Sequence, residues 1–228
     1  AYNQIRQIAF DKFNVKMILC NTGMFWTFMG GSHQVVEDIA SLRAIPELVL
    51  ISPSDAVEAK KATKAAASHA GPVAIRLAEP KMPVIFNDDY PFRIGEAAVV
   101  RDGNDLAIVS TGIMLLWSLE AAALLAEEGV SAKVINMHTI KPFDGESVRR
   151  AARETGAIVT VEDSSILGGL GGAVAEVISE SCPVPVRRIG VRDRFGQTGT
   201  IDELASEYGM SRTHIVKAAK ELVANKTR

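Results

Sequence analysis

Residues 105–137 read DLAIVSTGIMLLWSLEAAALLAEEGVSAKVINM. The stretch begins with a short apolar run at 105–110, continues with a long amphipathic run at 115–128 and ends with a second apolar run at 132–137. Gly129 follows the amphipathic run directly and is typical of a helix end. We therefore predict a strand, a helix and a strand, which is the repeating unit of a parallel sheet with right-handed crossovers.

The same alternation extends in both directions along the chain. Downstream, we predict helices at 144–155, 170–181 and 211–225, strands at 157–161 and 185–189, and a capping box at Thr200-x-x-Glu203. Upstream, we predict strands at 15–20, 48–51 and 73–77, helical spacing over 33–44, and a helix that Ser52 caps and that runs to His69.

A change of composition at residues 87–92 (NDDYPF) interrupts this pattern. We place a linker at 87–93, which divides the chain into residues 1–86 and 94–228. The expected fold is α/β, with two successive parallel or mostly parallel βαβ domains, each a three-layer α/β/α arrangement. Because the first domain supplies only about three strands, fewer than the usual five, we expect it to be truncated at its N-terminus.

Composition excludes several classes of protein. The chain has 228 residues, of which 47% are hydrophobic and 23% charged, so intrinsic disorder is excluded for most of it. The net charge of −2 argues against a nucleic-acid partner, and no apolar run is long enough to span a membrane. Residues 1–10 hold no signal-peptide core, and two cysteines are too few for a disulfide framework. We expect a reducing, cytoplasmic setting.

The strongest candidate for chemistry is His33, within Gly30-Gly31-Ser32-His33-Gln34. We expect His33 in the first turn of the following helix, whose positive end disfavours the imidazolium form. A neutral, hydrogen-bonding histidine fits a functional site, and it equally fits a helix-start histidine that bonds to the backbone.

Other polar and glycine-rich segments are weaker candidates. The run Gly168-Gly169-Leu170-Gly171-Gly172 precedes a helix, but its spacing matches no phosphate-binding loop, so we interpret these glycines as packing positions. Glu162 and Asp163 end a strand, at the edge where open α/β sheets often bind ligands, and they equally fit solvated loop charges. His138 follows a strand, where both a loop role and a site role remain open. His69 and His214 lie on predicted helices and have no partner in the sequence. Phe25, Trp26 and Phe28 line a pocket or pack against a partner.

Several motifs, in order along essentially all 228 residues, resemble the C-terminal part of a transketolase, particularly the C-terminal subunit of a split transketolase. GGSHQVVEDIASLRAIP at 30–46 looks like the family's Gly-x-Thr-His-Gln-x-x-Glu-Asp motif, and SPSDAVE at 52–58 looks like its next strand-to-helix turn. The family's C-terminal domain is matched at Thr111-Gly112, at NMHTIKPFD (136–144) and from Val161 to Gly171.

The resemblance implies thiamine diphosphate as cofactor, bound between a pyrimidine-binding and a diphosphate-binding domain. Residues 1–86 would be the back portion of the pyrimidine-binding domain, and 94–228 the C-terminal domain, which supports self-association. Magnesium would be held mainly by an N-terminal partner subunit that carries the diphosphate-binding domain. The family's activating glutamate and ring-stacking phenylalanine precede the motif matched by Tyr2–Arg6 and would lie upstream of Ala1. The cofactor-binding residues are therefore left unassigned.

Departures from the family pattern bear on the substrate. Two family residues that bind sugar hydroxyls, an aspartate and a histidine, fall on Met29 and Asn21, and the phosphate-binding arginine falls on Glu79. Arg76 is the nearby arginine that remains. Because a carboxylate repels phosphate, we expect an acceptor other than an ordinary sugar phosphate.

The function that we predict is transfer of a two-carbon ketol unit from a ketose to an aldose, by a subunit that is active only with its partner chain. His33 would hydrogen-bond the substrate, and Asn21 would line the same pocket. Two alternatives remain open. One is the β subunit of a 2-oxoacid dehydrogenase or a deoxyxylulose-phosphate synthase, and the other is a transketolase-like scaffold without catalytic activity.

Overall fold

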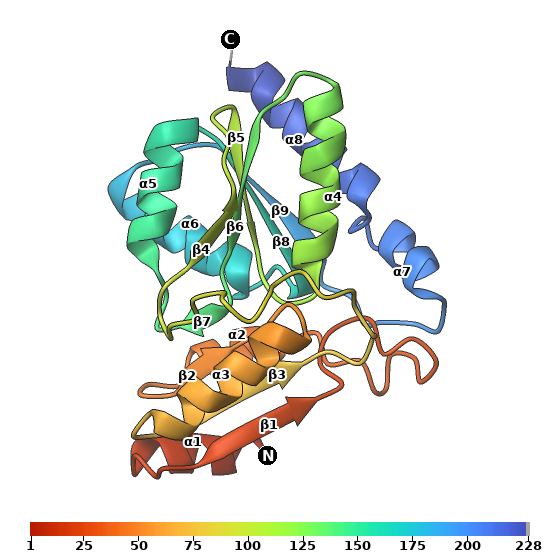
Figure 1. Cartoon of the computed structure of the whole chain (residues 1–228). Coiled ribbons are helices and arrows are strands. Elements are labelled where there is room, and N and C mark those ends of the chain that lie inside the picture. The colour runs from red at the N-terminus through yellow and green to blue at the C-terminus, as the bar shows by residue number, and fades with distance from the viewer. Residues whose placement is uncertain (227–228) are drawn as a thin grey trace.

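The computed structural model describes residues 1–226 and is built on two sheets (Figure 1). The larger sheet has the strand order β4-β6-β5-β8-β9, and all of its neighbours are parallel except β4 and β6. Its strands are β4 (Ala98–Arg101), β5 (Leu106–Ser110), β6 (Ala132–Asn136), β8 (Ile158–Ser165) and β9 (Val186–Val191).

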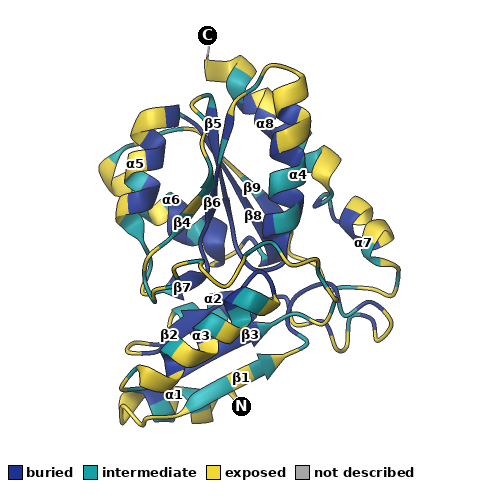
Figure 2. Cartoon of the chain, viewed as in Figure 1, coloured by how far each residue is buried: buried dark blue, intermediate teal, exposed yellow. Residues whose placement is uncertain are grey.

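The smaller sheet has the order β1-β3-β2-β7. It consists of β1 (Lys16–Cys20), β2 (Val49–Ile51), β3 (Val73–Leu77) and β7 (Thr139–Lys141). The first three strands are mutually parallel, and β7 pairs antiparallel with β2. Since β7 comes from the second half of the chain, the two halves share this sheet. Figure 2 shows β3 buried within it and β1 partly exposed at its edge.

Helices cover both faces of the larger sheet, which gives the expected three layers. Figure 1 shows α4 and α8 on one face, with α5 and α6 on the other. The helices are α1 (Tyr2–Phe10), α2 (Asp38–Arg43), α3 (Ala56–Ser68), α4 (Met114–Glu127), α5 (Gly145–Thr155), α6 (Leu170–Ser181), α7 (Ile201–Glu207) and α8 (Arg212–Lys226). None of these helices, within residues 1–226, is long and apolar enough to cross a membrane.

Most elements agree with the predictions from the sequence, and the differences are the first helix, the starts of other helices and two short strands. The strand 73–77, the helix 170–181 and the Thr200–Glu203 capping box are confirmed. Ser52 is not a helix cap, because Asp55 accepts the Glu58 N–H and α3 starts after it. The elements α1, β4 and β7 were not predicted. The predicted linker falls in residues 78–97, which contain no helix or strand, and the domain boundary stays a prediction.

A buried ion triad joins the two halves of the chain. The Arg76 guanidinium, on β3, lies 2.7 Å from Asp38 Oδ2 of α2 and 2.7 Å from Asp163 Oδ1 of β8. All three side chains are at most 7% exposed. Burial would lower the pKa of Arg76, but the two carboxylates raise it overall, so the guanidinium stays charged. The triad therefore fixes the first sheet against the end of β8.

A second buried polar cluster surrounds Glu58, whose side chain is fully buried. Its carboxylate accepts hydrogen bonds from the Ser54 N–H (2.7 Å), the Tyr90 hydroxyl (2.9 Å) and the Asn136 amide (2.7 Å). These partners lie before α3, in the connecting segment and on β6, so the cluster ties all three regions together. Burial raises the pKa of Glu58 to about 7.

Arg76→Met should lower the free energy of unfolding by about 3–5 kcal/mol at neutral pH, because two buried carboxylates lose the cation that they share. Urea unfolding of purified protein measures this loss. The matched control is Arg187→Met, which removes a pair with Glu221 in which both side chains are 44% exposed. Arg187→Met should lower the free energy of unfolding by less than about 1 kcal/mol. Equal losses in both variants would show that the triad stabilises no more than a surface pair.

Glu58 should make folding less favourable as the pH rises. Since its pKa is higher in the folded state than the ordinary 4.5, its contribution is present at low pH and is lost between about 4.5 and about 7. Glu58→Gln removes this titration, so the variant's stability deficit should shrink by about 2–3 kcal/mol from pH 5 to pH 8. Urea titrations at the two pH values measure it. A deficit that does not change with pH would contradict the raised pKa.

Candidate functional site

The loop at residues 23–35, here called the His33 loop, follows β1 at the carboxyl edge of the smaller sheet. Asn21 leaves β1 with a left-handed backbone (φ 59°), a conformation that asparagine tolerates better than most residues. An antiparallel bridge between Gly23 and Val35 closes the loop at its base, with the Gly23 N–H 2.9 Å from the Val35 carbonyl. The loop is therefore a defined excursion from the sheet.

His33 is exposed, and two neighbours orient its ring. The Ser32 hydroxyl lies 2.9 Å from Nδ1, and the Trp26 ring meets the imidazole edge to face at a centroid distance of 5.3 Å. Within residues 1–226 the side chain makes no other hydrogen bond, so Nε2 is available to a ligand. An imidazole held in this way can donate to, or accept from, a substrate oxygen.

The expectation that His33 begins a helix is wrong. Helix α2 starts five residues later, at Asp38, and His33 lies in a turn in which its own N–H bonds to the Gly30 carbonyl at 3.0 Å. Gly30 has a φ of 70°, which favours glycine at that turn. The orientation of the His33 side chain therefore comes from the turn, from Ser32 and from Trp26, and not from the start of a helix.

Two further predicted residues lie at the same edge of the sheet. Strands β1 and β3 are in parallel register with Cys20 opposite Leu77, and the Thr22 N–H donates to the Leu77 carbonyl at 3.1 Å. Asn21 and Glu79, which follow these strands directly, are therefore brought to one edge. Asn21 is half-buried and Glu79 is exposed. The structure thus places an amide and a carboxylate beside the root of the His33 loop.

Arg76 does not fit the role of a compensating phosphate ligand. Its side chain is 1% exposed and is paired with Asp38 and Asp163. Its position in the middle of a buried strand directs the guanidinium into the boundary between the two halves. This correction leaves Glu79 as the charged residue at the expected phosphate position.

The apolar run at 25–29 divides between core and surface. Phe25 is fully buried and packs edge to face on Trp117, with ring centroids 5.2 Å apart. Phe28 and Met29 are 84% and 46% exposed, so they form an apolar tip of the His33 loop. Large apolar residues exposed beside a candidate site are typical of a binding surface.

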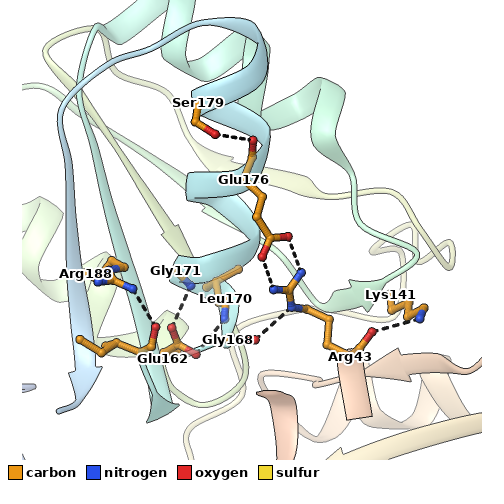
Figure 3. Close-up of polar contacts among 10 residues, drawn as sticks. Arg43, Lys141, Glu162, Gly168, Leu170, Gly171, Glu176, Ser179 and Arg188 are labelled. Atoms are coloured by element: carbon orange, nitrogen blue, oxygen red, sulfur yellow. Dashed lines mark hydrogen bonds and ion pairs between the residues drawn. The ribbon is translucent and has the colours of Figure 1, made fainter. Parts of the chain in front are cut away.

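The strand-end acids and the glycine run have structural roles. Glu162 accepts the N–H groups of Leu170 and Gly171, both at 2.8 Å, beneath the start of α6 (Figure 3). A Cβ on Gly169 would lie 2.0 Å from Glu162 Oε2, which confirms that this glycine is needed for packing. Burial raises the pKa of Glu162 to about 7, and Figure 3 shows Arg43 of α2 paired with Glu176 of α6 nearby.

His138 is also a structural residue. It is 1% exposed, and its ring lies 4.3 Å from that of Phe92. Burial lowers the pKa of His138 to about 4, so it stays neutral at physiological pH. It therefore supports the boundary between the two halves and offers nothing to a ligand.

The N-terminal residue has a local structural role. Ala1 is exposed and precedes α1, and its carbonyl accepts the Ile5 N–H of that helix at 3.1 Å. This hydrogen bond closes the first turn of the helix. The placement of the family's activating glutamate and stacking phenylalanine upstream of Ala1 stays a prediction, because it concerns residues outside the described range.

Sequence reasoning missed the contribution of residues 192–199, which pack against the His33 loop. The Gln34 side-chain amide donates to the Gln197 carbonyl at 3.0 Å. A cavity of about 320 Å³ lies beside this contact and is lined by Val36, Glu37, Ser165, Val191, Asp193, Arg194 and Phe195. The two segments are 163 residues apart in sequence, so no local pattern connects them.

The side chains at this site suit one part of a cofactor-dependent centre. An exposed imidazole, an amide and a carboxylate fit the recognition of substrate oxygens. Residues 1–226 contain no group of three or more His, Cys, Asp or Glu that could hold a metal ion.

Comparison with known proteins places this α/β chain in a class of enzyme subunits. Residues 1–84 match the family model of the transketolase pyrimidine-binding domain, and residues 95–215 match that of the transketolase C-terminal domain. The chain belongs to the transketolase family. The fold class and the interpretation as a transketolase-type subunit are therefore confirmed.

Similar proteins include subunits of specialised transketolases. The chain is 42% identical over 219 residues to the 6-deoxy-6-sulfo-D-fructose transketolase subunit of Clostridium sp. (strain MSTE9), covering 96% of this chain and 68% of that one. It is 38% identical over 217 residues to an apulose-4-phosphate transketolase subunit of Phocaeicola vulgatus, covering 95% and 69%.

A solved structure, a split-gene transketolase described as an inactive β4 tetramer, is similar with a TM-score of 0.92. It is 40% identical to this chain, and the match covers 98% of this chain and 72% of that one. At this identity the comparison supports both the fold and the family.

His33→Ala should lower turnover of the assembled enzyme by about 10²–10³-fold, the usual cost of removing one preorganised donor. Because His33 is exposed, circular dichroism and the melting temperature should stay unchanged. His69→Ala is the matched control, since His69 ends α3 at the opposite edge of the same sheet. Wild-type turnover in His33→Ala would remove this residue from the mechanism.

Proposed function

We propose that this chain is the C-terminal subunit of a thiamine-diphosphate-dependent transketolase, which moves a two-carbon ketol unit from a ketose to an aldose. The observation that carries the proposal is the exposed His33, oriented by Ser32 and Trp26 on a loop that is rooted at the sheet edge where Asn21 and Glu79 lie. The similarity to proteins that are named as transketolase subunits supports the proposal.

The cofactor and its metal are assigned mainly to a partner subunit. Members of the family use thiamine diphosphate with a divalent metal such as magnesium, and this chain offers no metal cluster in its described part. When bound, thiamine diphosphate supplies a nucleophilic carbon for carbonyl chemistry. The partner would carry the diphosphate-binding domain. Self-association through residues 94–228 and a cytoplasmic location complete the proposal.

The residues of this chain would bind and orient the substrate. His33 would hydrogen-bond a hydroxyl or carbonyl oxygen, and a charge that develops on that oxygen would strengthen the bond. Asn21 would offer its amide to a neighbouring hydroxyl. The apolar tip at Phe28 and Met29 would exclude water and would leave a hydroxyl that faces it unpaired, at a cost of about 1–3 kcal/mol.

Reconstitution with the partner subunit tests the proposed function. The complex, supplied with thiamine diphosphate and magnesium, is offered a ketose with an aldose, a 2-oxoacid, or pyruvate with glyceraldehyde phosphate. Ketol transfer supports the proposal. Turnover of a 2-oxoacid without ketol transfer would support the 2-oxoacid dehydrogenase alternative instead.

Glu79 should disfavour phosphorylated acceptors. A carboxylate at a position where an arginine pairs with phosphate removes a charge-assisted contact and adds a repulsive one. Wild type should therefore turn over unphosphorylated or deoxy aldehydes better than ribose 5-phosphate, and Glu79→Arg should shift this preference toward the phosphate ester. Competition assays on kcat/KM measure the shift.

The control for this substitution is Glu180→Arg, which makes the same change of charge on α6, outside the site. It should leave the preference unchanged. If wild type already prefers ribose 5-phosphate and Glu79→Arg has no effect, Glu79 does not face the acceptor phosphate.

A further inference from the structure

Both stems of the His33 loop are held by the end of β8, which belongs to the C-terminal half of the chain. The Met24 N–H donates to the Asp163 carbonyl at 2.9 Å, and the Ser165 N–H donates to the Val36 carbonyl at 2.6 Å. A Cβ on Gly23, whose φ is 83°, would lie 2.0 Å from Asp163 Oδ2. The base of the loop is therefore anchored to the end of β8.

A second contact holds the loop beside His33 itself. The Gln34 side chain is 5% exposed, and its amide donates to the Gln197 carbonyl at 3.0 Å. The same amide lies 3.4 Å from the Trp26 carbonyl. Gln34 therefore links both limbs of the loop to residues 196–199, because it follows His33 directly and its amide reaches the Trp26 carbonyl.

Glycines make this second contact close. A Cβ on Gly31 would lie 2.3 Å from the Gly196 carbonyl oxygen, and a Cβ on Gly196 would lie 1.6 Å from Gln34 Oε1. The two backbones thus approach each other at a distance that no side chain permits. Gly196 does not have a left-handed φ, so its lack of a side chain reflects space and not backbone strain.

The segment that contacts the loop is itself anchored. The Tyr208 hydroxyl donates to the Phe195 carbonyl at 2.7 Å. The Arg194 guanidinium lies 3.8 Å from the centre of the Tyr208 ring and pairs with Glu207 at 3.1 Å. Residues 196–199 therefore follow a segment fixed to the end of α7, and they can serve as a rigid support.

We propose that Gln34 and the segment 196–199 position the His33 loop for catalysis, which makes the C-terminal domain a working part of the active site. This inference rests on the proposed function, because it takes His33 as a substrate ligand. Gln34 is a positioning residue and not a catalytic one. Its effect reaches the substrate through the placement of His33 and Trp26.

A double-mutant cycle on Gly196→Ala and Gln34→Ala tests this positioning in the assembled, full-length enzyme. The methyl group added at position 196 should displace the Gln34 amide and move His33, and a displacement of about 1 Å can lower kcat by about 10²-fold. Shortening Gln34 removes the group that the methyl meets. The double variant should therefore match Gln34→Ala alone, whereas independent effects would multiply.

Further measurements separate positioning from a general loss of structure. Gly196→Ala should lower kcat more than it raises KM, with an unchanged melting temperature. Gly172→Ala is the matched control, because its added Cβ would meet only Arg43 at an ordinary 3.6 Å. It should leave kcat unchanged. Full turnover in Gly196→Ala, or multiplicative losses in the double variant, would overturn the inference.

Acrylamide quenching of tryptophan fluorescence reports on the loop without relying on activity. Trp26 is the more exposed of the two tryptophans, since it is half-buried and Trp117 is 7% exposed. Quenching of Trp26 should be greater in Gly196→Ala than in wild type. In the double variant it should equal the quenching measured in Gln34→Ala. If the wild-type complex catalysed no ketol transfer, the proposed function would fail, while this coupling would still decide whether the segment holds the loop. Unchanged quenching in Gly196→Ala would contradict the positioning.

Discussion

The placement of one half of this protein against the other depends on the buried Arg76 guanidinium between Asp38 and Asp163. One cation facing two carboxylates leaves an excess negative charge in a region without solvent, and burial raises the pKa of Asp163 despite the attraction of Arg76. Such a buried ion cluster contributes more to the specificity of packing than to the net stability of the fold. A domain in a shifted position would leave these charges unpaired. The triad thus specifies one relative position of strand β3, helix α2 and strand β8.

That position determines where the candidate site forms. Asp163 contacts the base of the His33 loop, and the segment 196–199 contacts the loop at Gly31 and Gln34, so both supports come from the C-terminal half. The loop carries the exposed imidazole, and the sheet edge carries Asn21 and Glu79. A site built from loops on a fixed scaffold is the usual arrangement in α/β proteins. Here the scaffold includes a domain that the sequence resemblance associates only with self-association.

Local sequence patterns predict most of the helices and strands. They do not predict contacts between residues that are distant in the sequence. The capping box at Thr200–Glu203 depends on residues three apart, so it is visible in the sequence. Strand β7 is three residues long and is a strand only because it pairs with β2. Arg76 looked like a ligand because its partners, at positions 38 and 163, are distant in sequence. His33 was found from its motif, but its turn geometry was not, because Ser32 and Trp26 act through tertiary packing.

The proposed function requires this subunit to contribute an oriented histidine to a site that a partner chain completes. A crystal structure of the assembled enzyme with a ketose bound tests it most directly. His33 Nε2 should lie within about 3 Å of a substrate oxygen, with residues 196–199 still packed against the His33 loop. A bound ketose that contacts only the partner subunit, with His33 facing solvent, would contradict it.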